Sequence, residues 1–204
     1  MEITKEIDTV IFDIGNVLVH FDWVGYLKSL EFDETTYEHV ADAMFRNEDW
    51  VAGDLGLVTT EEWLQLFIDN DPAYETQIRK TFARFGASIV PYEFTEQWIQ
   101  YFRRNGMKIY YLSNYSEELY RQSKERLLFL NQFDGGVFSW KEKCIKPDKD
   151  IYEILLSRYE IDPKHALFFD DREENVEIAV KLGIRGVVFR PEIARQMLKD
   201  AGRD

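Results

Sequence analysis

Four short apolar runs set narrow limits on the fold of this chain. They are Thr9–Asp13, Lys108–Ser113, Ala166–Asp170 and Gly186–Phe189. Runs that are this short and almost continuously apolar are typical of strands buried on both faces of a sheet. Because such strands occur mainly in parallel sheets covered by helices, we predict parallel strands at these positions.

Segments with helical spacing lie between and after these runs. Their apolar residues recur every three or four positions, as expected for helices with one buried face. Strands that alternate with helices in this way predict a doubly wound, Rossmann-like α/β fold with a parallel sheet. The residues that define the helices are Phe94, Trp98 and Phe102; Leu119, Ser123, Leu127 and Leu130; Ile151, Ile154 and Leu155; and Val176, Ala179 and Val180.

Residues 23–88 interrupt the alternation. We predict a small all-helical insertion here, within a core made of residues 1–22 and 89–204. A module inserted directly after the first strand would lie over the carboxyl ends of the strands, where open α/β sheets bind ligands. The prediction of helices rests on the helical spacing of Tyr37, Val40, Ala41 and Met44 and on the capping-box pair Thr59 and Glu62, which opens a further helix. Between these segments we predict a Gly-rich turn at Gly53–Gly56.

Composition excludes several classes of partner. The chain has 204 residues, 45% of them hydrophobic, which is enough to bury one sizeable core. Lys and Arg total 25 against 38 Asp and Glu, so the net charge is -13 and the surface repels nucleic acids and anionic membranes. The start MEITKEIDTV lacks a secretion-signal pattern, no apolar run approaches a membrane span, and Cys144 is the single cysteine. We therefore expect a cytoplasmic protein without an internal disulfide.

Polar residues gather where the predicted strands end or on loops at the same edge of the sheet. These clusters are Asp13, Ser113-Asn114, Lys146-Pro147 and Asp170-Asp171. Carboxylates from two segments supply the hard oxygen ligands that Mg²⁺ prefers. A hydroxyl and a lysine beside them can hold phosphate oxygens, so the combination predicts phosphoryl-transfer chemistry.

The order of these clusters resembles the haloacid dehalogenase superfamily of hydrolases. Its four motifs correspond to FDIGNVL, YYLSN, KCIKPD and FFDDREENVEIAVKLG, which span nearly the whole chain. The helical insertion between the first two motifs resembles that superfamily's small cap of the first type. The resemblance implies that Asp13 attacks phosphorus and becomes an aspartyl-phosphate. It also implies that Ser113 and Lys146 bind the transferring group and that Asn114 helps to shape its pocket.

The resemblance further implies a Mg²⁺ site. Its ligands would be Asp13, the backbone carbonyl of Gly15 and Asp171, with Asp170 either a direct ligand or a support for one. Asn175 matches a polar position of the last motif and would orient the acids. A carboxylate approaches an anionic phosphate only if positive charge neutralises the repulsion, so the metal and Lys146 are coupled requirements.

One acid of the usual catalytic pair is absent. Most phosphatases of the superfamily carry Asp-x-Asp and use the second acid to protonate the leaving alcohol, whereas this chain has Gly15 followed by Asn16. A branch with Asp-x-Gly-Asn at this point includes sugar-phosphate phosphatases. General acid-base assistance is worth about 10² to 10⁴ in rate, so its absence should slow poor leaving groups most. His20 and Asp22 are candidate replacements, although a surface turn explains both equally well.

We predict a Mg²⁺-dependent phosphatase of small phosphorylated metabolites, with sugar phosphates as the leading class. Most aromatic residues of the insertion should form its own small core, and we expect one or two to face the substrate, with Trp50 or Phe45 as the candidates. A hydrolytic dehalogenase is the first alternative, but it needs no metal, and the acid pair Asp170-Asp171 would then have no purpose. A relative that binds ligands without catalysis is the second alternative, favoured by Gly15 and opposed by the retained nucleophile and lysine.

Overall fold

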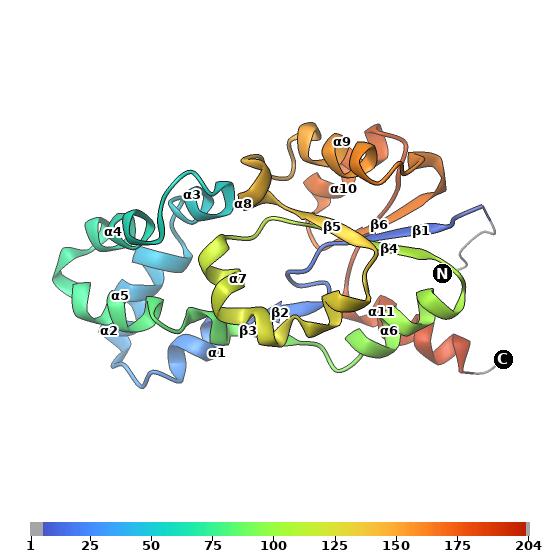
Figure 1. Ribbon diagram of the computed structural model, residues 1–204. Coiled ribbons are helices and arrows are strands. Elements are labelled where there is room, and N and C mark those ends of the chain that lie inside the picture. Colours follow the sequence, from blue (N-terminus) through green and yellow to red (C-terminus); the bar gives the residue numbers. More distant parts are fainter. Residues whose placement is uncertain (1–5, 203–204) are drawn as a thin grey trace.

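A five-stranded parallel sheet forms the centre of the computed structural model, which describes residues 6–202. The strand order is β5-β4-β1-β6-β7, so the first strand of the chain lies in the middle (Figure 1). This order confirms the predicted doubly wound α/β fold. The strands are β1 (Thr9–Phe12), β4 (Lys108–Ser113), β5 (Gly135–Phe138), β6 (Ala166–Asp170) and β7 (Arg185–Val188).

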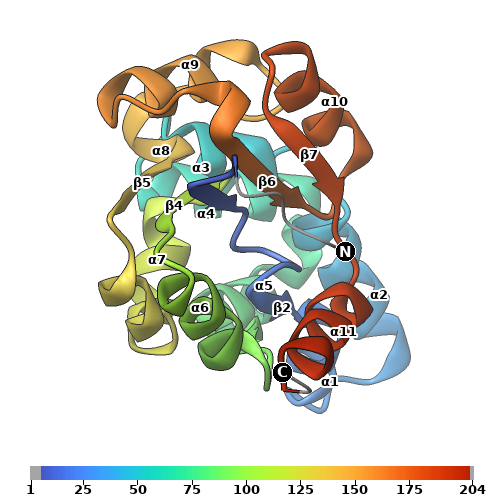
Figure 2. The same ribbon diagram turned by 90° about the vertical axis from the view of Figure 1, so that its right-hand side faces the viewer.

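Helices cover both faces of the sheet, as Figure 2 shows with the strands nearly end-on. On one face lie α9 (Lys149–Arg158) and α10 (Glu173–Lys181), and on the other lie α6 (Thr95–Arg104) and α11 (Pro191–Ala201). Alternate residues of β1 face opposite sides: Ile11 belongs to the core under α9 and α10, whereas Val10 and Phe12 belong to the larger core that includes α6. Burial on both faces explains why β1 and β6 are almost continuously apolar.

The 23–88 segment lies to one side of the sheet in Figure 1. A short antiparallel pair, β2 (Val19–Phe21) with β3 (Ile89–Pro91), joins the two points where the chain leaves and re-enters the core. Aromatic side chains fill the interior of the segment, among them the buried Trp63 and Phe67. Its helices are α1 (Trp23–Lys28), α2 (Glu34–Val40), a π-helical turn (Ala41–Phe45), α3 (Trp50–Leu55), α4 (Thr60–Asn70) and α5 (Glu75–Phe82).

The predicted capping box is confirmed at the start of α4. The backbone N–H of Glu62 donates to the Thr59 hydroxyl at 3.2 Å, and the backbone N–H of Thr59 donates to the Glu62 carboxylate at 2.8 Å. These two bonds satisfy backbone groups that the first turn of a helix leaves without partners.

Three local predictions were wrong. Leu119 to Leu130 do not lie on one helix, because α7 (Glu117–Ser123) ends early and two 3₁₀ turns follow. The strand β5 was missed, since its two glycines gave no apolar run. The predicted turn at Gly53–Gly56 is instead the last turn of α3. Of these four residues, only Gly56 takes the left-handed conformation, with φ of 60°.

No helix within residues 6–202 is both long enough and apolar enough to span a membrane.

Candidate active site

Strand ends bring the predicted site residues to one edge of the sheet. Asp13 directly follows β1, and its backbone N–H donates to the carbonyl of Phe169 at 2.9 Å, continuing the β1–β6 pairing. Ser113 ends β4 and Asp170 ends β6. Because the three strands are parallel neighbours, their carboxyl ends meet at the same place. Asp13 is 8% exposed, while Ser113 and Asp170 are fully buried.

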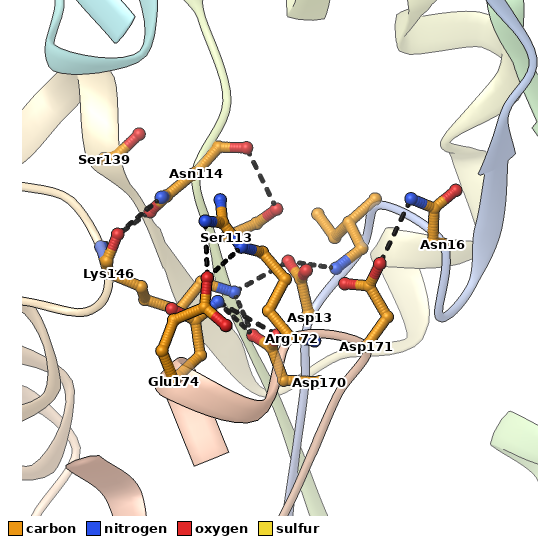
Figure 3. A network of polar contacts seen from close by, with 12 residues as sticks. Asp13, Asn16, Ser113, Asn114, Ser139, Lys146, Asp170, Asp171, Arg172 and Glu174 are labelled. Carbon is orange, nitrogen blue, oxygen red and sulfur yellow. Dashed lines mark hydrogen bonds and ion pairs between the residues drawn. The ribbon is translucent and has the colours of Figure 1, made fainter. Parts of the chain in front are cut away.

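Lys146 lies at the centre of this group, 2% exposed (Figure 3). Its Nζ is 2.9 Å from Oδ1 of Asp13 and 2.6 Å from Oδ2 of Asp170. Asn114 fixes the lysine backbone from both sides: its Nδ2 donates to the Lys146 carbonyl at 2.9 Å, and its Oδ1 accepts from the Lys146 N–H at 2.8 Å. Asn114 therefore determines where the ammonium group stands.

The two adjacent acids at the end of β6 have different surroundings. Both oxygens of Asp170 already accept hydrogen bonds from protein groups, from Arg172 N–H and from Asn175 Nδ2 at 2.9–3.1 Å in addition to the lysine. Asp171 is half-buried, and its Oδ2 accepts from Asn16 Nδ2 at 3.2 Å. Asp171 thus has more capacity for an external ligand than Asp170.

The carboxylates crowd together closely enough to perturb one another. The pKa of Asp13 is raised to about 7, chiefly by burial and also by the charges of Asp170 and Asp171, against the opposing ammonium of Lys146. Burial and the charge of Asp170 also raise the pKa of Asp171. Burial alone would lower the pKa of Lys146, but the carboxylates of Asp13 and Asp170 raise it, so the lysine is a fixed cation.

The donor set fits a hard divalent cation. Asp13, Asp170 and Asp171 each offer an oxygen within 4.8 Å of the others. Only one ammonium group, that of Lys146, is paired with these three carboxylates among residues 6–202, so the cluster has an excess of negative charge. Oδ1 of Asn175, a residue that lines the same cavity, is also buried without a hydrogen-bond partner among those residues. Carboxylate and carbonyl oxygens with surplus negative charge are what Mg²⁺ binds in proteins.

A cavity of about 220 Å³ opens beside the cluster. The core contributes charged and polar groups to its wall, and the 23–88 segment contributes Trp50 and Asp54 from α3. Ser113 is close by but is not part of this wall. The lining residues are Asp13, Gly15, Asn16, Phe21, Trp50, Asp54, Ile89, Asn114, Tyr115, Leu119, Lys146, Asp171, Arg172 and Asn175.

The candidate replacements for the absent acid lie elsewhere. His20 is exposed on β2 and stacks on Tyr92, with ring centroids 6.1 Å apart. The Asp22 carboxylate accepts from the backbone N–H of Gly25 at 2.9 Å and so caps α1. Neither residue lines the cavity. His20 therefore lies in a strand and Asp22 serves as a helix N-cap, not in a surface turn as expected.

Trp50 lines the cavity as expected, whereas Phe45 packs behind it, 5.7 Å away between ring centroids. Asp54 was not predicted as a site residue, because it lies between two glycines that indicated a turn. The signal that could have found it is the four-residue spacing from Trp50, which places both side chains on one face of a helix. Asn16 was also missed as a partner of Asp171.

Curated relatives of the chain include a phosphatase and a hydrolase. It is 23% identical to the sesquiterpene phosphatase astK of Aspergillus oryzae, over 92% of both chains. It is 25% identical to flavin mononucleotide hydrolase 1 of Arabidopsis thaliana, over 74% of this chain and 60% of the relative. It is also 30% identical to acyl-CoA dehydrogenase family member 10 of the mouse, but spans only 18% of that protein's length.

Solved structures share the fold. A haloacid dehalogenase family enzyme from Bacteroides thetaiotaomicron, in complex with magnesium and inorganic phosphate, has a TM-score of 0.70 at 20% identity, covering 90% of this chain and 94% of the other. The L-2-haloacid dehalogenase of Xanthobacter autotrophicus has a TM-score of 0.62 at 16% identity, covering 95% and 83%. The family model of the haloacid dehalogenase-like hydrolases matches residues 7–183 of the sequence. The chain therefore belongs to that family.

Proposed function

We propose that this protein is a Mg²⁺-dependent phosphatase of small phosphorylated metabolites that acts through an aspartyl-phosphate on Asp13. The observation that carries the proposal is the grouping of Asp13 with a buried lysine 2.9 Å away and two further acids within 4.8 Å. A carboxylate beside positive charge is suited to attack phosphorus, because neutralisation of its charge reduces the repulsion between the carboxylate and the anionic phosphate ester. Relatives named as a sesquiterpene phosphatase and a flavin mononucleotide hydrolase support this chemistry.

Each group of the site has a role in this proposal. Asp13 is the nucleophile, and Lys146 holds an oxygen of the transferring phosphoryl group together with Ser113. Asn114 keeps Lys146 in position through its two hydrogen bonds.

Asp13, Asp171 and the carbonyl of Gly15 would hold Mg²⁺, which supplies charge neutralisation when bound. Asp170 supports the site from behind, because its oxygens already serve Lys146, Asn175 and Arg172.

The cavity favours a small leaving group. Its volume of about 220 Å³ lies below the ~300–1,000 Å³ of pockets that take drug-sized ligands. Sugar phosphates are the leading substrate class, because Trp50 and Tyr115 offer aromatic surface and Asp54 a polar group. Phosphate esters of apolar alcohols are the second class, favoured by Phe21, Ile89 and Leu119 in the wall and by the sesquiterpene phosphatase among the relatives.

Phosphate release from aryl, sugar and prenyl phosphates tests the proposal. We expect turnover that requires Mg²⁺, stops with a chelator and is abolished by Asp13→Asn. Asp8→Asn, at the exposed opposite end of β1, is the matched control and should retain full activity. Mg²⁺ at about 100 times its Kd should raise Tm by roughly 5–10 °C, and Asp171→Asn should remove most of that shift.

Two outcomes would replace the proposal. Hydrolysis of haloacids without added metal would make the protein a dehalogenase. Specific binding of phosphate esters without any turnover would make it a ligand-binding relative.

A further inference from the structure

We propose that Asp54 of α3 supplies the acid and base function that the core lacks at Gly15, so that the proton of the reaction comes from the 23–88 segment. The inference rests on the proposed phosphatase function and adds a catalytic residue to it. Asp54 lines the same cavity as Asp13 and Lys146, although it lies 41 positions beyond the proposed nucleophile in the sequence.

The carboxyl of Asp54 has no structural task that would explain its position. Its Oδ1 is inaccessible to solvent and has no hydrogen-bond partner among residues 6–202. A buried polar atom without a partner is destabilising by about 1–3 kcal/mol, and such atoms are uncommon in folded proteins. Because Asp54 also lines the cavity, a rotation of its side chain would bring this oxygen to a ligand that enters there.

The backbone of Asp54 is anchored to the core. The hydroxyl of Ser139 donates to the Asp54 carbonyl at 2.6 Å and accepts from the Tyr115 N–H at 2.9 Å. Lys143 Nζ bonds the carbonyl of Gly56 at the end of α3. A Cβ on Gly56 would meet the backbone oxygen of Trp140 at 2.5 Å, so the end of α3 rests directly on α8 (Ser139–Glu142).

Burial keeps a substantial fraction of the Asp54 carboxyl protonated near neutral pH. Its pKa is raised to about 7, chiefly by burial and also by the charge of Asp13, against the opposing charges of Lys146 and Arg172. On the α7 side of the cavity stands Tyr115, whose own pKa is raised, chiefly by burial, and which therefore remains neutral. A general acid is most effective when its pKa is close to the working pH.

The two proton transfers follow from this placement. When an oxygen of Asp13 bonds to phosphorus, the bond between phosphorus and the ester oxygen breaks, and its electron pair goes to that oxygen. Protonated Asp54 gives its proton to this oxygen, which leaves as the alcohol. Asp54 carboxylate then takes a proton from water as the water oxygen attacks phosphorus. The bond from phosphorus to Asp13 breaks, the carboxylate is restored, and inorganic phosphate is released.

The position of the absent acid remains open. A Cβ built on Gly15 meets no atom within 4 Å, so an aspartate can be placed there without a clash at its first carbon. Gly15→Asp therefore offers a way to return the proton donor to the core when Asp54 has been removed.

The leaving group decides the test, because only a poor leaving group needs a proton. We compare kcat/KM for an alkyl phosphate and for dinitrophenyl phosphate, whose phenolate leaves without protonation. Asp54→Asn should lower the alkyl value by about 10² to 10⁴ and the dinitrophenyl value by less than about five-fold. With dinitrophenyl phosphate it should also lower kcat and produce a burst of phenolate, because hydrolysis of the aspartyl-phosphate loses its base.

Matched variants separate catalysis from structure. Asp69→Asn, the same change at an exposed position of α4, should alter neither substrate. Gly15→Asp combined with Asp54→Asn should recover alkyl-ester turnover at least about ten-fold over Asp54→Asn alone.

Two results distinguish a failure of the Asp54 proposal from a failure of the phosphatase proposal. Equal losses on both substrates in Asp54→Asn, with an active parent protein, would overturn the role of Asp54 and leave the phosphatase proposal intact. Absence of dinitrophenyl phosphate turnover in the parent protein would overturn the phosphatase proposal itself.

Discussion

The edge of the sheet and the 23–88 segment contribute to the same cavity in different ways. At the edge, Asp13, Ser113 and Asp170 are positioned by the backbone pairing of parallel strands, so their meeting point follows from topology. In the segment, Asp54 is positioned by a short helix that rests on α8 and is bonded by Ser139. The positions of side chains at strand ends depend on the pairing of the whole sheet. The position of a side chain on a docked helix depends on only a few contacts. The proposed nucleophile is thus held by the paired strands, and the proposed proton donor by a part with fewer constraints.

The largest effect is expected at the sheet edge, from Lys146→Met. Removal of the ammonium leaves Asp13 and Asp170 buried without their counter-charge, which should lower the free energy of unfolding by about 3–5 kcal/mol at pH 8 in the absence of metal. Activity should fall by about 10²- to 10³-fold or more, because the phosphoryl group loses a charged donor. Urea unfolding and phosphate release measure the two effects.

Lys149→Met is the control for this change, because Lys149 is exposed and pairs with exposed acids on α9. It should change stability by no more than about 0.5 kcal/mol. Equal stability of both variants would mean that the edge does not depend on its buried ion pairs.

The next effect concerns the pH dependence of Asp54. Because the folded state raises its pKa from 3.8 to about 7, this carboxyl binds its proton more tightly in the folded protein. Its contribution to stability is therefore complete below about pH 4 and is lost as the pH rises to about 7. Asp54→Asn should unfold at a higher temperature than the parent protein at pH 8, with little difference at pH 4.5.

The gain at pH 8 should be about 2–4 kcal/mol, or roughly 5–15 °C in Tm, by thermal unfolding in the two buffers. Asp69→Asn should show no such change between the two pH values. A Tm difference for Asp54→Asn that is the same at both pH values would contradict the buried, protonated state of Asp54.

The smallest effect should come from Thr59→Ala at the start of α4. Loss of the capping hydroxyl should cost about 1 kcal/mol, or roughly 3 °C in Tm, without a change in kcat/KM beyond about two-fold. The exposed Thr35→Ala, in the first turn of α2, is the control. A parallel fall in alkyl-phosphate turnover would show that the interior of the segment, and not only α3 on α8, positions the catalytic groups.

Strands buried on both faces could be predicted from the sequence because their composition alone identifies them. Lys108–Ser113 and Ala166–Asp170 coincide with β4 and β6. The strand at Gly135–Phe138 could not be predicted, since its glycines leave room for rings of neighbouring residues: a Cβ on Gly136 would lie 2.3 Å from Tyr111. Its strand character comes from pairing with β4, which is a tertiary effect.

The site could be predicted only in part for a related reason. Asp13, Lys146 and Asp171 come from motifs that have a fixed order along the chain, and the structure brings them to one place. Asp54 belongs to no such motif, and its importance depends on how α3 packs on α8. Short-range patterns do not contain that information, because a Gly-Asp-Leu-Gly sequence fits a turn as well as a helix end.

The bond from Ser139 to the Asp54 carbonyl has a consequence for substrate selection. Any displacement of α3 that breaks this bond withdraws the carboxyl along with the helix. An ester too bulky for α3 to stay seated would still reach Asp13, but its alkoxide would depart without a proton. Selection by size would then appear in the rate of bond cleavage as well as in affinity. Oversized esters would bind at the site but be hydrolysed slowly, and so would act as competitive inhibitors.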